Sequence, residues 1–529
     1  MRSYYSHLDA IKKAKEKPYV LRASSLFPVW QQAGLSTRLL FMGYWFVKRH
    51  IQRIAQQLVL RNSQGVLLLR TALEELQAAK AYRIELSTLL EQAEWQSDAP
   101  FEGSIELSFH SLVDLVFPFP AVVVNYYGKE FSSVVHTAER VYNDFDDWKA
   151  NSASQVGEGG FNIYAKEELH PFVALVNGPE EMGQESELPI TFYNKQGESY
   201  ATHYLLPPLE PYAMHRVLLK ELLSDKRDFL GDGVGTVKLH CPLPWVFPRL
   251  LAGNFVELPG ADPEQAMVVT HSYYDCTDAI KASDYWNKAP ETAYDAVLMI
   301  PLCVSKGWFT TIYFYPLYSP TRFSLDLEVY NSEGTLVARI PSLGHFTSDR
   351  FLPLSLAPFL LRSLPLVEER LAARLLVRTD ADAQLPSRIK IGVDIGHEAG
   401  HLPCNICTNL QVYNPQLETK KSSFKWAPLL FDQPGGEAWI MSSHPKQPFD
   451  ETASVELTFF READEATIQR KKRIPANGFL YLNQDEELAA FFGNSIGWFT
   501  AITSNPYTTG YYFNRRTDGG LCIGGDHVF

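Results

Sequence analysis

Apolar and polar residues alternate along much of the chain in short runs, which is the pattern of β-strands. Residues 455–460, Val-Glu-Leu-Thr-Phe-Phe, are a clear example, because an alternation of period two places the apolar side chains on one face of a strand. Gly, Pro, Asn and Asp separate such runs throughout the chain. Short strands joined by turn residues predict a mainly β protein.

One combination of strand and turn occurs three times. An apolar segment runs into Asn-x-x-Gly, a turn whose last residue needs a positive φ. The three copies are Leu58–Gly65, Ile190–Gly197 and Leu327–Gly334. Their glycines are 132 and 137 residues apart. An apolar residue followed by proline recurs every 134 residues and adds a fourth copy, at Pro207, Pro341 and Pro475. These spacings predict tandem copies of one module of about 130 residues.

The repeats divide the chain into an N-terminal extension and four modules. The extension is residues 1–35, and the modules are residues 36–149, 165–286, 290–433 and 434–529. The expected fold is therefore four tandem, diverged β-sandwiches of immunoglobulin or fibronectin type. Residues 70–95 are an exception, because their leucines and alanines follow helical spacing and predict some helix in the first module.

Charge and composition narrow the range of partners. The net charge of −13 and pI near 5.6 should repel a phosphate backbone, so nucleic acid is not an expected partner. No uncharged stretch reaches the roughly 20 residues that a transmembrane helix needs, and the first residues lack an apolar signal-peptide core. A soluble, acidic, cytoplasmic protein is expected. Its six cysteines are too sparse for a disulfide scaffold and are expected to be free and buried.

The sharpest chemical motif is His397-Glu398-Ala-Gly-His401, which matches H-E-x-x-H. Over these five residues it resembles the zinc-binding signature of the zincin metallopeptidases. The resemblance implies that His397 and His401 are zinc ligands and that Glu398 is the base that activates a water. A zincin site requires a helix, however, and the preceding residues 388–395 alternate like a strand. Glu418 is merely the nearest downstream carboxylate for a third ligand.

The same loop offers a different metal site. His397, His401, Cys404 and Cys407 form H-x3-H-x2-C-x2-C, a suitable tetrahedral set for structural zinc. If the loop binds no metal, the two cysteines are expected to be buried as small apolar residues and the two histidines to lie on the surface. We expect no cofactor, with structural zinc as the alternative.

Two further patterns concern the modules and their surfaces. Histidines recur near the ends of three modules, at His136, His271 and His527. They indicate a repeated ligand or, as we favour, a side chain that closes the last strand by hydrogen bonding. Aromatic groups such as Gly307-Trp-Phe309 and Tyr511-Tyr-Phe513 suit sugar stacking or protein contacts, unless they fill the sandwich cores.

The polar positions that the copies share indicate the expected function. The shared polar positions are turn residues, which shape a fold and do not react, so we expect a non-enzymatic binding or scaffold protein. Its partner would be a protein, a carbohydrate or a second copy of the chain. The alternative is a metal-dependent hydrolase with its site in the third module, which carries the apparent insertion 356–382 and the loop 397–407.

Overall fold

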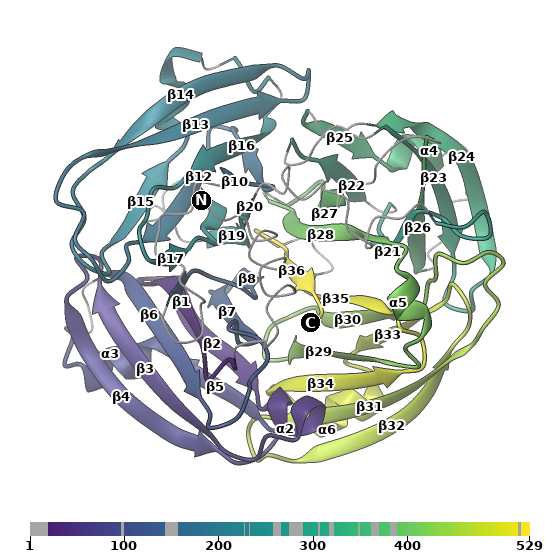
Figure 1. The fold of residues 1–529 in the computed structure, drawn as a ribbon, viewed down its shortest axis with the longest axis horizontal. Coiled ribbons are helices and arrows are strands. Elements are labelled where there is room, and N and C mark those ends of the chain that lie inside the picture. Colours follow the sequence, from purple (N-terminus) through teal and green to yellow (C-terminus); the bar gives the residue numbers. More distant parts are fainter. Residues whose placement is uncertain are drawn as a thin grey trace. The chain divides into compact units, whose positions relative to one another are not determined.

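The structure is a computed structural model of the 529-residue chain. It describes residues 19–96, 100–142, 157–226, 228–231, 233–257, 266–274, 289–304, 307–316, 322–346, 350–360, 370–380, 389–400, 402–516 and 520–529. Contacts divide the chain into two compact units, Met1–Asp275 (unit 1) and Cys276–Phe529 (unit 2), and each is described by itself. Both consist mainly of antiparallel sheets, which confirms the prediction of a mainly β protein (Figure 1). Among the described residues, no helix is long and apolar enough to cross a membrane.

Unit 1 begins with strand set 1, which forms two four-stranded sheets in the orders β1-β6-β3-β4 and β5-β2-β7-β8. The set comprises β1 (Arg22–Gln31), β2 (Ser36–Met42), β3 (Ile54–Asn62), β4 (Leu67–Leu76), β5 (Ala81–Glu85), β6 (Phe101–His110), β7 (Val122–Tyr127) and β8 (Ser132–Val135), with helices α2 (Tyr44–Arg49) and α3 (Leu86–Gln92). The buried Trp45, Phe41 and Phe109 pack between its strands.

Strand set 2 completes unit 1 with the orders β14-β13-β16-β10-β20 and β15-β12-β18-β19, and β11 also pairs with β16. It comprises β10 (Gly157–Gly159), β11 (Asn162–Tyr164), β12 (Leu169–Val176), β13 (Ser186–Asn194), β14 (Ser199–Leu206), β15 (Met214–Leu218), η1 (Glu221–Lys226), β16 (Val234–His240), β18 (Leu251–Val256), β19 (Ala266–His271) and β20 (Tyr273–Tyr274). A separate two-stranded sheet pairs β9 (Arg140–Val141) with β17 (Val246–Phe247).

Unit 2 begins with strand set 3, one eight-stranded sheet in the order β24-β23-β26-β21-β28-β27-β22-β25. The set comprises β21 (Ala296–Leu302), β22 (Trp308–Phe314), β23 (Phe323–Tyr330), β24 (Leu336–Phe346), β25 (Leu352–Ser355), α4 (Ala357–Leu360), β26 (Leu371–Thr379), β27 (Ile389–His397), β28 (Cys404–Val412) and α5 (Pro415–Glu418). Its apolar side chains form one continuous core, to which Leu298, Leu327 and Ile391 belong.

Strand set 4 completes unit 2 with two four-stranded sheets, β29-β34-β31-β32 and β33-β30-β35-β36. It comprises β29 (Ser423–Leu430), β30 (Gly436–Met441), β31 (Ala453–Arg461), β32 (Thr467–Ile474), β33 (Phe479–Asn483), α6 (Glu486–Phe492), β34 (Ile496–Thr503), β35 (Thr509–Asn514) and β36 (Gly524–His527). In β31 the buried Val455, Leu457 and Phe459 alternate with the more exposed Glu456 and Thr458, as the period-two pattern predicts.

One strand order recurs in the described residues of all four sets. In set 2, β10 and β11 both pair with β16 and are counted together as the first strand. The first strand then pairs with the sixth in every set, the second pairs with the fifth and seventh, and a short helix follows the fifth. In set 3 the pairing of β21 with β28 joins the two halves into one sheet. The immunoglobulin order pairs the first strand with the second. The likeness to immunoglobulin or fibronectin modules is therefore wrong at the level of strand order.

Strand pairing crosses several of the predicted module boundaries. β1 pairs with β6 although it lies in the predicted extension 1–35. β10 and β11 precede residue 165, and β29 precedes residue 434. The apparent insertion 356–382 contains β26, which pairs with β21 and β23 inside the eight-stranded sheet and is therefore no insertion.

The helix predicted over residues 70–95 is reduced to α3, Leu86–Gln92. The preceding residues form β4 and β5. β4 lies at the edge of its sheet, and most of its residues are exposed or half-buried, so it lacks the buried alternating face by which a strand is recognised.

Candidate functional site

A pocket of about 520 Å³ opens in unit 2, a size that suits a small ligand. The residues that line it are Trp308, Arg370, Gly435, Gly436, Glu437, Tyr481, Asn483, Gln484 and Arg515. Glu437 and Tyr481 come from β30 and β33, which are neighbours in one sheet, and Arg515 directly follows β35 on the other side of β30 (Figure 1). Strand pairing therefore places these three polar side chains together.

The carboxylate of Glu437 lies at the centre of a hydrogen-bond network and is 5% exposed. Its Oε1 accepts from the Trp439 indole nitrogen and from Arg515 Nε, both at 3.1 Å. Its Oε2 accepts from the Tyr481 hydroxyl at 2.6 Å and from Arg515 Nη2 at 3.1 Å. A carboxylate offers about four acceptor sites, so these four donors use the acceptor capacity of Glu437.

Arg515 links Glu437 to the aromatic side of the pocket. Its guanidinium lies 4.7 Å from the centre of the Trp308 ring, and its Nη1 donates to Cys303 Sγ at 3.1 Å. Burial lowers the pKa of Arg515, but the neighbouring Cys303 and Glu437 outweigh it and raise the pKa above its usual value. Burial raises the pKa of the Cys303 thiol to about 11, so this group is protonated at neutral pH.

Tyr481 supplies a second aromatic ring. Burial and the Glu437 carboxylate raise the pKa of its hydroxyl, which therefore stays a neutral donor. The guanidinium of Arg370 stacks over this ring, 3.9 Å from its centre. The pocket thus combines two aromatic rings with charged and amide groups.

The H-E-x-x-H motif begins next to this pocket. His397 is the last residue of β27 and the cross-strand partner of Trp308, and their rings meet edge to face with centres 4.9 Å apart. Its Nδ1 accepts from the Ala399 amide at 3.1 Å, and the Glu398 amide donates to Gly307 O. Residues 398–400 form a turn and a bend, so the described part of the motif lacks the helix of a zincin site. His401 lies outside the described residues.

The two cysteines of the proposed zinc set lie in β28. Cys404 belongs to the apolar core of unit 2 with Ile406, whereas Cys407, three residues further on, points to the other face of the strand. Side chains on opposite faces do not converge on one ion, so this geometry speaks against Cys404 and Cys407 as joint ligands. The five described cysteines are all free and buried, as predicted, and Cys276 lies outside the described residues.

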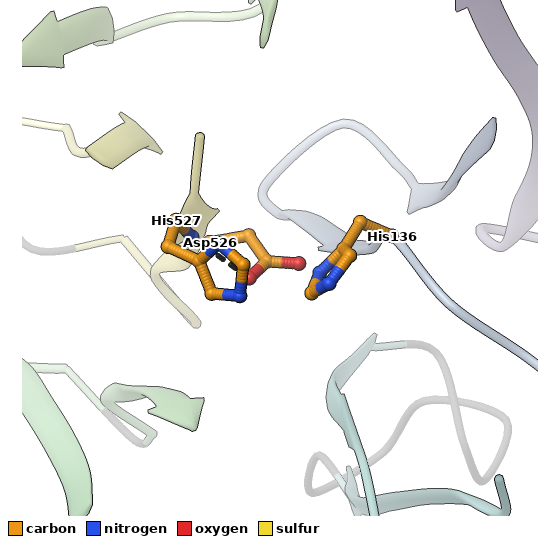
Figure 2. A group of neighbouring side chains, drawn as sticks. All are labelled: His136, Asp526 and His527. Atoms are coloured by element: carbon orange, nitrogen blue, oxygen red, sulfur yellow. Dashed lines mark hydrogen bonds between the residues drawn. The ribbon is translucent and has the colours of Figure 1, made fainter. Parts of the chain in front are cut away.

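The recurring histidines stand at the ends of the eighth strands of their sets. His271 ends β19 and His527 ends β36, and in both the ring Nδ1 contacts the carbonyl of the next residue, at 2.8 Å and 3.0 Å. Figure 2 shows the end of β36, where the His527 amide donates to Asp526 Oδ1 at 2.8 Å. In unit 1, His136 follows β8 and its ring lies 5.0 Å from that of His271. Both contacts are local, and the two interpretations of the recurring histidines, a repeated ligand and a strand-closing side chain, stay predictions.

The sequence pattern pointed to Trp308 and His397 and missed Glu437, Tyr481, Arg370 and Arg515. One signal was available, because Glu437 is the charged residue of the otherwise uncharged segment Gly436–Met441, which is buried throughout. A buried carboxylate requires partners, and these lie in other strands.

Comparisons with known proteins add little. No family model and no curated protein matches the chain. Among solved structures, a glycosyl hydrolase family 2 member from Bacteroides cellulosilyticus is 8% identical with a TM-score of 0.10 and covers 51% of this chain. A β-glucuronidase from glycoside hydrolase family 2 is 10% identical with a TM-score of 0.11 and covers 46%. The matches span 33% and 26% of those chains, and at these TM-scores they carry no argument.

Proposed function

We propose that the protein is a non-enzymatic binding protein built from four tandem copies of one eight-stranded β-sandwich module. The strand order shared by sets 1 to 4 supports the four copies. Three Asn-x-x-Gly turns support them as well, since Gly65, Gly197 and Gly334 all have positive φ, at 81°, 84° and 74°. In this proposal the modules are a scaffold, and the pocket of unit 2 holds the ligand.

The ligand that we propose is a carbohydrate. A sugar ring presents C–H groups, which pack on aromatic rings, and hydroxyl groups, which need fixed hydrogen-bond partners. The pocket offers the rings of Trp308 and Tyr481 beside the amide side chains of Asn483 and Gln484. This combination of rings and planar polar groups in a pocket of ligand size is the observation that carries the proposal.

The protonation and bonding of the lining groups favour binding over chemistry. A hydrolase needs a free carboxylate, thiolate or imidazole to move protons or to attack. Glu437 is the carboxylate among the described lining residues, and four donors already occupy its oxygens. Cys303, which lies behind Arg515, is held as a neutral thiol.

An array of printed oligosaccharides tests the proposal. The full chain should be retained by a subset of the glycans. Trp308→Ala should weaken that retention by about tenfold or more, because the stacking of a nucleic-acid base on one aromatic ring is worth on the order of 1–3 kcal/mol and we expect a comparable loss for a sugar ring. Tyr19→Ala is the matched control, since Tyr19 is an aromatic residue of unit 1 that is 68% exposed. Retention of no glycan, or equal retention of the two variants, would refute sugar binding. Cleavage of a retained glycan would refute the non-enzymatic assignment.

A further inference from the structure

We infer that the unit 2 pocket selects saccharides that carry a negative charge, with Arg370 as the residue that recognises the charge. This inference rests on the proposed sugar binding and names the class of sugar. The first support is the charge of the lining. Two guanidinium groups, Arg370 and Arg515, stand beside one carboxylate, Glu437, so the described lining carries one net positive charge. In a chain with a net charge of −13, this local surplus runs against the overall field.

The two arginines differ in whether their charge and their N–H donors are already used by other protein groups. Arg515 forms a bidentate pair with Glu437 and donates a third hydrogen bond to Cys303, and its side chain is 16% exposed. Its charge is therefore balanced inside the protein. Arg370 is exposed, and among the described residues it has no acidic partner and no hydrogen-bond acceptor. The surplus charge of the pocket thus belongs to Arg370.

The contact with Tyr481 holds Arg370 in place without using its donors. A guanidinium stacked over an aromatic ring is attracted through its face, at a centre distance here of 3.9 Å. The N–H groups lie at its edge, in a planar fork that matches the two oxygens of a carboxylate or of a sulfate group. Tyr481 is itself fixed by its hydrogen bond to the buried Glu437. The result is a cation that the Tyr481 ring holds at the pocket and whose N–H groups stay available to an anionic group.

The test compares glycans with the same backbone in neutral, carboxylate-bearing and sulfate-bearing forms, printed on one array. The wild-type chain should retain anionic members about tenfold or more strongly than the neutral form, and added salt should reduce this preference. Arg370→Gln keeps a polar side chain and removes the charge. It should abolish the preference and change retention of the neutral glycan less than twofold. Arg322→Gln removes the same charge from an exposed position of unit 2 and should leave the preference unchanged.

Each outcome has a separate meaning. Preference for either anionic form, lost in Arg370→Gln alone, supports the inference, and the stronger of the two forms identifies the group that the pocket recognises. Equal retention of neutral and anionic glycans, or an equal effect of the two substitutions, would overturn it and leave sugar binding intact. Retention of none of the three forms would overturn the sugar-binding proposal itself. The melting temperature of each variant confirms that the compared proteins are folded.

Discussion

In unit 1 the turn Asn62–Gly65 packs against residues 211–214, and in unit 2 the turn Asn331–Gly334 packs against residues 476–479. Corresponding backbone atoms make the main contacts in the two units. The Met214 amide donates to Ser63 O at 2.9 Å, and the Phe479 amide donates to Ser332 O at 3.2 Å. A Cβ atom at Gly65 would lie 2.2 Å from Pro211 O, and one at Gly334 would lie 2.1 Å from Ala476 O. Both receiving loops also contain a residue of positive φ, Tyr212 at 61° and Asn477 at 60°.

The side chains behind the two turns differ. In unit 1, Arg61 of β3 pairs with Glu106 of β6 at 3.3 Å. In unit 2, Glu328 of β23 pairs with Arg374 of β26 at 3.1 Å, and the Tyr330 hydroxyl donates to the same carboxylate. Val59 and Glu328 each lie three residues before the asparagine of their turn. Their cross-strand partners are Glu106 in β6 and Arg374 in β26. The corresponding position of the sixth strand therefore carries an acidic residue, Glu106, in unit 1 and a basic residue, Arg374, in unit 2.

In the proposed repeat of one module, this difference separates the packing features that tolerate divergence from those that do not. The turn contact is made by backbone atoms, and it requires an Asn-x-x-Gly turn with no side chain on its glycine. A buried ion pair requires two opposite charges at neighbouring positions and is indifferent to which strand supplies which charge. The backbone contact has consequently kept its sequence pattern, whereas the ion pair has not.

The largest expected effect concerns the buried ion pairs. Glu328→Gln should leave the buried Arg374 without its counter-charge, since the two side chains are 8% and 5% exposed, and should destabilise unit 2 by about 3–5 kcal/mol. Glu106→Gln should destabilise unit 1 comparably. Hydrogen exchange followed by mass spectrometry, read on peptides from β23 and β26 or from β3 and β6, measures each unit separately.

The double variant Glu328→Met with Arg374→Met is the control for this prediction. Removing both charges removes the unpaired ion, so the double variant should be closer to the wild type than Glu328→Gln is. A double variant that is less stable than the single variant would show that the pair matters through its other contacts, such as the bond from Arg374 to His444 O.

A smaller effect is expected at the turn glycines. Gly334→Ala should cost about 1–2 kcal/mol for the left-handed backbone and about 1–3 kcal/mol more for the clash with Ala476 O. Gly65→Ala should cost as much in unit 1. Gly231→Ala separates the two terms, because Gly231 also has a positive φ, of 57°, and its added Cβ atom would have its nearest neighbour, Gln196 Nε2, at an ordinary contact distance of 3.7 Å. Losses of stability in Gly334→Ala and Gly231→Ala that coincide would show that the close contact is relieved without cost.

Local rules made the strands and turns predictable. The alternation in 455–460 and the three Asn-x-x-Gly turns are short patterns whose physical cause lies within a few residues, and the structure confirms both. β4 was missed because it is an exposed edge strand held by its pairing with β3. The pocket was beyond prediction for a related reason. Glu437 and Arg515 are 78 residues apart, and only the pairing of β30 with β35 brings them together.

The smallest expected effect concerns the turn asparagines. It compares how much the asparagine side chain contributes to the stability of each turn. Asn62 Oδ1 accepts from the amides of Gln64 and Val66, at 3.1 Å and 2.9 Å, whereas Asn331 Oδ1 accepts from the Thr335 amide at 2.9 Å. Each such bond contributes about 0.5–1.5 kcal/mol, so Asn62→Ala should cost unit 1 about twice the stability that Asn331→Ala costs unit 2.

Asn194→Ala is the reference for these losses of stability. This buried side chain accepts two such bonds and also donates to Phe229 O, so its removal should cost the most of the three. Hydrogen exchange of the turn peptides measures all three losses. Equal losses would mean that the backbone contact, and not the asparagine, holds each turn in its conformation.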